Sequence, residues 1–354
     1  MVLYQGVKDI EASSSKKLAA IERVFTNYVK KLPDYQWTKT LSSRVYKMTF
    51  RHFGEALSRF FRGLGKFPKF KRKKNGDSFT VDAADWNHSV LLEASKSIKI
   101  PTLGTFRLKE AIPFKCMAQT FTISRYADKW YVSFVIKAEK VPPMLHVVTE
   151  PVGIDLGVST FATLSDGNVY SSPRPLLKAK TKLSQDMWRN RHKQLGNRLL
   201  GVRASKNARK HYRRVAKLHA KVANQRRDFL QKTTTEISKK YAHIRIEDLN
   251  VFGMIGNHKL AAAISDCGFY EFRRQLAYKS SMYGTTVELV DRWYPSSKTC
   301  SFCGHVQPMP LKERVFDCLH CGAIIDRDLN AAINLARQSE LVRPVRSEVT
   351  PVDK

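Results

Sequence analysis

The spacing of hydrophobic side chains changes twice along the chain and divides it into three stretches. From residue 13 to residue 61, apolar positions recur every three or four residues, which predicts two or three helices broken at Pro33. From residue 78 to residue 137, short runs such as KWYVSFVIK alternate apolar and polar positions, as strands with one buried face do. We therefore expect a small antiparallel barrel or sheet here, ended by the proline pair at 142–143. The residues predicted to share the buried face of the last strand are Trp130, Val132, Phe134 and Ile136.

From residue 149 the pattern alternates strands with helices. Strands are expected in VGIDLGVSTFATLSDGNVYSS, in residues 244–246 and in TTVELVD. Helices are expected in a long region after residue 178, in residues 259–282 and in RDLNAAINLARQ. This alternation predicts an α/β fold with a mixed sheet, followed by a loose tail at residues 339–354.

The charge of the chain narrows the class of its partner. Its 62 Lys and Arg against 31 Asp and Glu give a net charge of +31. So large a surplus attracts polyanions and penalises cationic partners. Nucleic acid is therefore the expected partner, and an anionic membrane surface is the second choice. The ordinary content of Gly (17) and Pro (14) excludes collagen-like and wholly disordered chains.

Targeting signals and several enzyme motifs are missing from the sequence. No run reaches the roughly 18 apolar residues that span a bilayer, and the N-terminal residues MVLYQGVKDIEASSSKK lack the apolar core of a secretory signal. We therefore expect a cytoplasmic, nucleoid-associated protein without membrane contact. In that reducing compartment, six cysteines indicate metal binding or free thiols rather than disulfides. Without HExxH, Walker A or GxSxG motifs, protease, ATPase and esterase functions lack their residues.

Two segments are strongly basic. Residues 59–76 hold eight Lys and Arg, four Phe and no acid, which fits either a solvated linker or a phosphate contact with stacking faces. Residues 178–245 hold 21 Lys and Arg against three acids, on helices whose apolar stripe indicates packing on one side. The predicted nucleic-acid-binding residues are Lys69, Lys71, Arg72, Lys73, Lys74, Arg209, Lys210, Arg213, Arg214, Arg226 and Arg227.

Four of the cysteines have the spacing of a metal site. They form two CxxC pairs, TCSFCG and DCLHCG, separated by 14 residues, and a glycine after each pair lets the backbone turn. Four thiolates would fill a tetrahedral zinc site and leave no position for water, so the zinc is expected to be structural. A disulfide pair or an iron centre is the alternative. The expected zinc ligands are Cys300, Cys303, Cys318 and Cys321, while Cys116 and Cys267 are expected to be core thiols.

Acids occur at positions where three predicted elements begin, end or are interrupted. Asp155 interrupts an apolar run, Glu247 and Asp248 end the strand at 244–246, and Asp326 and Asp328 open the last helix. Carboxylates brought together from such elements repel one another unless a cation neutralises them, and hard oxygens of this kind hold Mg²⁺ for phosphodiester hydrolysis. For Asp248 and Asp326, a structural role as helix cap or arginine partner is the favoured interpretation.

Several sequence blocks, read together, resemble the TnpB family, the OrfB-type proteins of IS200/IS605-like and IS607-like transposons that are related to type V CRISPR nucleases. The resemblance covers residues 150–337 almost continuously and, less tightly, an N-terminal segment that begins with LPDYQWTKTLSSRVYKMTF. The blocks that carry it are GIDLGVSTFATLSDG, ANQRRDFLQKTTTEI, IRIEDLNVFGM, KLAAAISDCGFYEFRRQLAYKSSMYG, DRWYPSSKTCSFCG and CGAIIDRDLNAAINLA.

The resemblance implies a RuvC nuclease domain of RNase H-like fold with an inserted zinc ribbon. It also implies an N-terminal wedge-like β-barrel with a helical recognition insert. The implied divisions are a recognition lobe with basic segment (1–77), a barrel (78–148), a nuclease core with basic helices (149–297), a ribbon (298–323), a last nuclease segment (324–338) and a tail (339–354). Family members usually have a further strand and helix ahead of the segment that begins here near Tyr4, so about 40 residues of the family pattern, including a strand of the barrel, are expected to be lacking here.

By motif position, the resemblance also assigns the catalytic, magnesium-binding acids. They are Asp155 in GIDLG, Glu247 in IEDLN and Asp328 in DRDLNAA, with Asp326 as the fallback for the third. The implied activity is RNA-guided cleavage of double-stranded DNA by a transposon-encoded enzyme, with catalytic Mg²⁺, structural Zn²⁺, and DNA and a transposon-derived guide RNA as partners.

Two other functions stay open at this point. One is a nucleic-acid-binding accessory protein that regulates transposition without cutting. The other is structure-selective cleavage like that of junction resolvases, which fits the three acids but not the ribbon or the charge of +31. The sequence leaves the oligomeric state, the guide and the target-adjacent motif undetermined.

Overall fold

The computed structural model describes residues 14–69, 77–83, 90–100, 103–136, 146–197, 200–310, 312–340 and 342–345. Internal contacts divide the chain into two compact units, Met1–Glu139 and Lys140–Lys354. Lys69 is an exposed residue of the first unit, whereas Lys71, Arg72, Lys73 and Lys74 lie outside the described residues. Within the described residues, no helix is both long and apolar enough to cross a membrane.

The first unit begins with the predicted helices. They are α2 (Ser14–Asn27) and α3 (Ser43–Phe61), joined by the short 3₁₀ helices η1 (Val29–Lys31) and η2 (Pro33–Thr40). Pro33 opens η2, where its missing N–H costs no helical hydrogen bond. The Phe25 ring lies 5.5 Å from the ring centroids of both Tyr46 and Phe50, so aromatic contacts pack α2 against α3. The helices predicted between residues 13 and 61 are therefore confirmed.

Antiparallel strands follow in the first unit. The strands β1 (Ser78–Asp82), β2 (Val90–Leu91), β5 (Cys116–Tyr126) and β6 (Lys129–Ile136) form one sheet, and β3 (Ser97–Ile100) pairs with β4 (Gly104–Arg107) in a hairpin. Phe121 and Phe134 face the core with ring centroids 6.2 Å apart. The prediction for Trp130 is wrong, because this side chain is 60% exposed beside Arg125 at the hairpin end of β6. Closure of these strands into a barrel stays a prediction.

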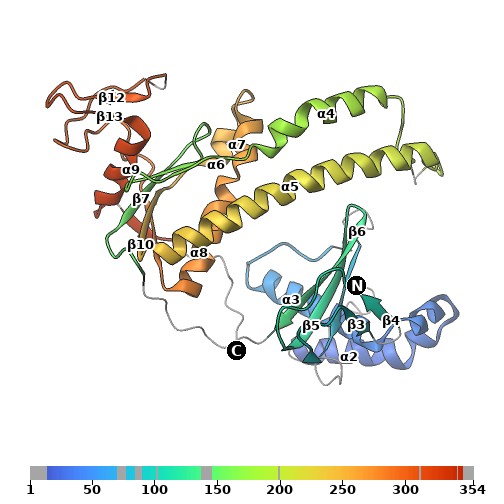
Figure 1. The fold of residues 1–354 in the computed structure, drawn as a ribbon. Helices are drawn as coiled ribbons and strands as arrows, with labels where there is room; N and C mark the ends of the chain where they lie inside the picture. The colour runs from blue at the N-terminus through green and yellow to red at the C-terminus, as the bar shows by residue number, and fades with distance from the viewer. Residues whose placement is uncertain are drawn as a thin grey trace. The chain divides into compact units, whose positions relative to one another are not determined.

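The second unit is built on a mixed six-stranded sheet, as its pattern predicts (Figure 1). The strands β7 (Val152–Leu156), β8 (Ala162–Leu164) and β9 (Val169–Tyr170) run antiparallel, and β10 (His243–Glu247) pairs in parallel with both β7 and β11 (Thr286–Val290). With β14 (Val342–Pro344), the order is β14-β11-β10-β7-β8-β9. Because Ile154 pairs with Ile246, the next residues, Asp155 and Glu247, lie side by side at one edge of the sheet.

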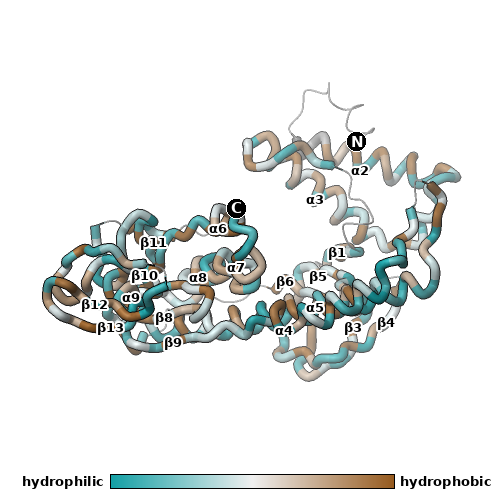
Figure 2. Tube along the Cα trace, turned by 90° about the horizontal axis from the view of Figure 1, so that it is seen from above, coloured by the Kyte–Doolittle hydropathy of each residue, from teal (hydrophilic) through white to brown (hydrophobic). Residues whose placement is uncertain are grey.

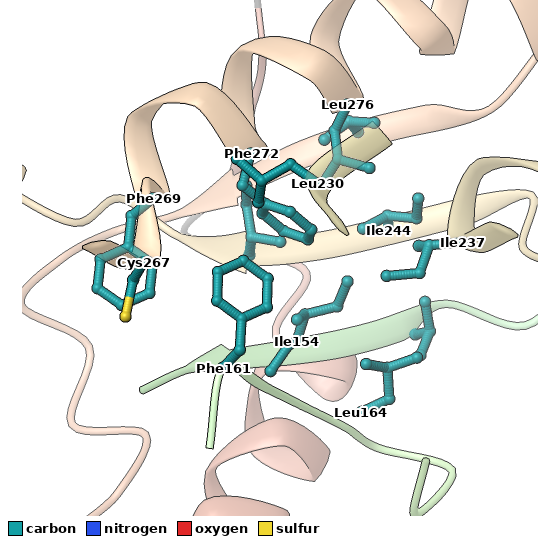
Figure 3. Packing of buried hydrophobic residues seen from close by; sticks show 14 of the residues in the cluster. Ile154, Phe161, Leu164, Leu230, Ile237, Ile244, Cys267, Phe269, Phe272 and Leu276 are labelled. Atoms are coloured by element: carbon teal, nitrogen blue, oxygen red, sulfur yellow. The ribbon is translucent and has the colours of Figure 1, made fainter. Parts of the chain in front are cut away.

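Helices cover both faces of this sheet. On one face, α5 (Lys206–Lys240) and α8 (Phe269–Tyr283) contribute Leu230, Ile237, Phe272 and Leu276 to a core that also holds Ile154 (Figure 3). On the opposite face lies α9 (Arg327–Arg337), which packs closely on β7. A Cβ at Gly153 would collide with the α9 backbone at Ala332, so this close approach requires glycine. Side chains alternate along β7, so Asp155 faces α9 together with Gly153.

A helix pair extends from the sheet and carries most of the predicted basic region. It consists of α4 (Pro175–Arg189) and the long α5, which lie side by side (Figure 1). Figure 2 shows long hydrophilic stretches along both helices. The single helix predicted for residues 259–282 is wrong in one respect: Gly268, with a φ of 74°, divides it into α7 (Ala261–Cys267) and α8. Cys267 is buried in the core, as predicted, while Cys116 packs half-buried against the sheet of the first unit.

The prediction of a loose tail at residues 339–354 is wrong for residues 342–344, and residues 346–354 lie outside the described residues. Val342–Pro344 forms β14, which pairs antiparallel with β11 at the edge of the sheet. A side-chain contact holds the same segment, because Arg343 forms an ion pair with Asp248 at 2.5 Å. Single-sequence pattern gave no signal for this strand, since three residues are too short to show alternation.

Candidate active site

Three acids come together on the α9 face of the sheet. Asp155 is the second-last residue of β7, Glu247 ends β10, and Asp328 lies in the first turn of α9. Their proximity shows in the acidity of Asp155, whose pKa rises to about 7 through burial first and then through the negative charges of Asp328 and Glu247. Burial and the neighbouring Asp248 carboxylate also raise the pKa of Glu247. Carboxylates that face one another in a buried site favour protonation, and a bound cation would reverse that preference.

Asp326 and Asp328 lie two residues apart but have different roles. The Asp326 carboxylate caps α9, because its Oδ1 accepts a hydrogen bond from the Leu329 N–H at 2.9 Å. Asp328 raises the pKa of Asp155 more strongly than Asp326 does, and it lies 4.0 Å from the Arg314 guanidinium. The interpretation of Asp326 as a helix cap is thus confirmed, which leaves Asp328 as the acid directed at Asp155.

Asp248, next to Glu247, is held in a different way. Its carboxylate is almost fully buried and receives Arg273 at 2.8 Å, Arg292 at 2.6 Å and Arg343 at 2.5 Å. Burial opposes ionisation, but hydrogen bonds and charges from these arginines prevail and lower the pKa of Asp248. The predicted role as an arginine partner is confirmed. Through these ion pairs, Asp248, directly after β10, contacts α8, β14 and the segment that follows β11.

This arrangement predicts that Asp248→Ala lowers the free energy of unfolding but has a smaller effect on the rate of DNA cleavage. Removing the carboxylate leaves three guanidinium groups without their shared partner, which should lower the free energy of unfolding by about 3 kcal/mol. Chemical denaturation measures the change. The matched control is Glu271→Ala, because Glu271 also pairs with an arginine, Arg274, but is more exposed than Asp248. An Asp248→Ala protein with the wild-type unfolding midpoint would contradict this role.

The four cysteines form a compact cluster. Among the described residues, they are the one group of three or more metal-binding side chains whose ligand atoms all lie within 4.8 Å of one another. The Sγ atoms of Cys300 and Cys321 lie 3.7 Å apart, and those of Cys303 and Cys318 lie 3.6 Å apart. The three acids repel one another, and their carboxylate oxygens do not all lie within 4.8 Å of one another. The predicted cysteine site therefore has a geometry that could bind zinc.

Local backbone geometry explains how the cysteines converge. In each CxxC pair the following glycine adopts a left-handed φ, 78° at Gly304 and 71° at Gly322, and its N–H donates to the carbonyl of the first cysteine at 2.9 Å. The backbone N–H groups of Cys321 and His320, together with the Cys321 and Cys300 thiols, lower the pKa of Cys318 to about 6, while the pKa values of Cys303 and Cys321 are raised, so the cluster favours one thiolate. Thiolates bind metal more readily than thiols, so these turns prepare the sulfur for a metal ion.

Two buried asparagines join the cysteine cluster to α9, and sequence reasoning missed them. Asn330 accepts the Ser301 N–H through Oδ1 at 2.9 Å and donates to the Thr299 carbonyl at 2.7 Å. Asn334, one turn later, donates to the Ser296 carbonyl at 2.8 Å. Two amides four residues apart among the apolar residues of NAAINLA were the available signal. They connect the segment that carries Cys300 to the helix that carries Asp328.

The structure separates the predicted basic residues of α5 into two groups. Arg209, Lys210, Arg213 and Arg227 are exposed, as is Arg214, which also lies 3.4 Å from Asp186. Arg226 is instead half-buried and forms an ion pair with Asp266 at 2.8 Å. Asp266 also accepts the Leu176 N–H at the start of α4. Arg226 therefore joins α5 to α7 and α4, and we remove it from the nucleic-acid-binding set.

The exposed group predicts a steep dependence of nucleic-acid affinity on salt. Each phosphate that a lysine or arginine neutralises adds about 0.9 to the slope of log affinity against log salt for duplex DNA. Replacing Arg209, Lys210, Arg213 and Arg214 together with glutamine should weaken binding to all sequences and lower the slope by about 2 to 4. Filter binding of a labelled duplex at several salt concentrations measures both effects. A variant with an unchanged slope would show that this surface does not contact phosphate.

Comparison with known proteins places the whole chain in one group. A family model described as "Probable transposase" (OrfB of IS605) matches residues 133–258, and one described as "Cas12f1-like, TNB domain" matches residues 269–335. A relative from Streptomyces pristinaespiralis is 34% identical over 86% of this chain and 74% of its own length. InsQ from Escherichia coli is 32% identical over 91% of this chain and 83% of its own length. Both relatives carry the name "Putative RNA-guided DNA endonuclease".

A solved structure supports the likeness at the level of the fold. It is the cryo-EM structure of a Cas12f1–sgRNA–target DNA complex, to which this chain aligns with a TM-score of 0.55. The alignment covers 96% of this chain and 78% of the Cas12f1 chain at 16% sequence identity. Both proteins therefore share a mixed α/β architecture.

Proposed function

Since the chain belongs to the TnpB family, as its relatives above 30% identity show, we propose that it is an RNA-guided DNA endonuclease. The observation that carries the proposal is the convergence of Asp155, Glu247 and Asp328 on one edge of the sheet. A nuclease needs such a carboxylate group to place metal ions at a phosphodiester. The names of the relatives indicate the class of substrate, DNA that is selected through an RNA, and we propose that this DNA is double-stranded. The basic surface of α5 supplies charge that suits both nucleic acids.

The sheet order supports assignment of the second unit to the RNase H-like fold of RuvC nucleases. Three antiparallel strands are followed by two parallel ones, in the order β11-β10-β7-β8-β9. This order puts the ends of β7 and β10 next to each other, where ligands of open α/β sheets usually bind. In our proposal the core covers residues 149–297, the ribbon 298–323 and the last nuclease segment 324–338.

The acid group fits Mg²⁺. Asp155, Glu247 and Asp328 offer only hard oxygen ligands, and burial together with the charges of Asp328 and Glu247 raises the pKa of Asp155, an effect that a bound divalent cation would offset. Mg²⁺ bound there would activate water and stabilise the leaving oxygen of the cleaved strand. In this scheme Asp155, Glu247 and Asp328 would hold the metal, while the Asp326 cap fixes the first turn of α9, which carries Asp328.

The cysteine cluster fits structural zinc. Cys300, Cys303, Cys318 and Cys321 provide four soft sulfur ligands from two knuckles, which is a complete tetrahedral set. Zinc there would close the loop between β11 and α9, which contains the hairpin of β12 (Val315–Asp317) and β13 (Ile324–Asp326). Through Asn330 and Asn334, a fixed ribbon positions the start of α9 and so supports Asp328.

The first unit is the part that we propose as a recognition region. Its α2 and α3 would form the helical recognition lobe of residues 1–77, and its antiparallel strands the wedge-like part of residues 78–148. The exposed Lys69 at the start of the basic segment fits a phosphate contact there. Guide RNA and DNA are the proposed partners of this unit.

The experiment that tests the guided function is recovery of the guide. The protein is purified from cells that carry its own locus, and RNA bound to it is sequenced beside RNA from a mock purification. We expect a discrete RNA that ends at the boundary of the transposon. A protein that carries only background RNA would contradict RNA guidance and favour a non-cleaving accessory role.

A further inference from the structure

The four tryptophans that the structure describes are unusually exposed. Among the described residues, Trp37, Trp130, Trp188 and Trp293 are 61%, 60%, 65% and 85% exposed. Tryptophan is on average among the most buried residues, because exposing its large apolar ring to water costs much free energy. On a protein with a net charge of +31, exposed indole rings are available for contact with a polyanion that also carries flat aromatic groups.

Trp188 is held in place more firmly than a surface side chain usually is. It lies in the last turn of α4, and the guanidinium carbon of Arg191 lies 4.5 Å from its ring centroid. The same guanidinium donates a hydrogen bond to the Trp188 carbonyl at 3.0 Å, which fixes it over the ring. One face of the indole is therefore covered by a cation, while the exposed fraction of the side chain leaves the rest open.

The corner of the chain that carries this pair is itself tightly built. Asn190 donates to the Asp186 carbonyl at 2.7 Å, and Lys193 donates to the Asn190 Oδ1 at 2.5 Å. Tyr212 on α5 donates to the Lys193 carbonyl at 2.8 Å and so ties the corner to the second helix of the pair. The ring is therefore presented on a rigid frame, which reduces the entropy lost when a ligand binds.

The charge around Trp188 selects an anionic ligand. From residue 175 to residue 227, Asp186 is the single acid in the sequence. Its carboxylate is already engaged, since it lies 3.1 Å from the His211 Nδ1 and 3.4 Å from the Arg214 Nη1. Asp228 and Glu236, the other acids of α5, lie further along this helix and contact Lys232 and Tyr170. Between residues 175 and 227, therefore, Asp186 is the only carboxylate that could compete with a phosphate for the lysines and arginines.

From this geometry we propose that the Trp188–Arg191 pair is a stacking site for one unpaired base of single-stranded nucleic acid. The base lies on the open face of the indole, and the neighbouring basic side chains bind the adjoining phosphates. Bases within a duplex have no free face, so the site discriminates between single and double strands. The inference deepens the proposed function, in which a guide RNA pairs with one DNA strand and leaves the other unpaired.

Binding of short oligonucleotides to the full-length protein tests the site without any cleavage step. Fluorescein-labelled dT, rU and duplex DNA probes are titrated in the absence of Mg²⁺ with the wild type and with Trp188→Ala, Trp188→Phe and Met187→Ala. Met187, 51% exposed on the same helix, is the matched control. Because all three changes are at exposed positions, their thermal midpoints should match that of the wild type.

We expect Trp188→Ala to weaken single-strand binding by about 5- to 150-fold, with an unchanged salt slope. Trp188→Phe should retain part of the affinity, and Met187→Ala should retain all of it, while duplex affinity stays within about twofold of wild type. A loss confined to dT or to rU identifies the strand as DNA or RNA. Equal single-strand affinity of wild type and Trp188→Ala, or equal loss for single strands and duplex, would overturn the site but not the nuclease. A wild type that binds none of the probes would contradict both.

Discussion

Replacing Asp155 with alanine is expected to reduce DNA cleavage by about a thousandfold or more, because metal ligands act as a unit. Burial and the charges of Asp328 and Glu247 raise the pKa of Asp155 to about 7, so all three acids belong to one site. Glu247→Ala and Asp328→Ala should have effects of the same order. Nucleic-acid affinity should survive in all three variants, because the exposed arginines and lysines of α5 are unchanged. Cleavage and binding are measured on the same preparations.

Asp326→Ala is the control that separates chemistry from structure. It removes a carboxylate two residues from Asp328, but one that caps α9 through the Leu329 N–H. We expect a loss of about 1 kcal/mol in the free energy of unfolding and nearly normal cleavage. If Asp326→Ala were as inactive as Asp328→Ala, or if Asp155→Ala cut at the wild-type rate, our assignment of the acids would be wrong.

Loss of two zinc ligands is expected to have the second large effect. We expect elemental analysis to find one Zn²⁺ per wild-type chain, and the double variant Cys318→Ser, Cys321→Ser should lose it. The ribbon buries only a few apolar side chains, among them Met309 and Phe316, so metal binding of order 10 kcal/mol is needed to fold it. Cleavage should fall as well, because the ribbon then no longer positions α9 through Asn330.

Cys116→Ser is the matched control for this variant. It removes a half-buried thiol of the first unit and should leave the zinc content at one per chain. Finding no metal in the reduced wild type, or full zinc in the double variant, would exclude the site.

Sequence patterns identified those features that depend on local spacing. The charged Asp155 within an apolar strand, the two CxxC pairs and the alternation of strands and helices all follow from residues close in the sequence. The parallel pairing of β7 with β10, which brings Glu247 beside Asp155, then required only the usual geometry of an α/β sheet.

Features that depend on contacts between distant segments could not be predicted in this way. The pairing of Arg226 with Asp266 and the attachment of Arg343 to Asp248 join positions 40 and 95 residues apart. A charge count treats such arginines as free surface cations. The exposure of Trp130 has a similar origin. Alternation along a strand predicts which side chains share a face, but it does not show how far along the strand other elements cover that face.

Cleavage of a matched duplex tests the central claim most directly. The protein is purified with the RNA from its own locus and mixed, with Mg²⁺, with duplex DNA that either matches that RNA or carries a scrambled sequence. We predict cleavage of the matched duplex alone, and none of either duplex by Asp155→Ala. A wild-type complex that binds the matched duplex but leaves it intact, or cuts both duplexes equally, would contradict RNA-guided cleavage by these acids.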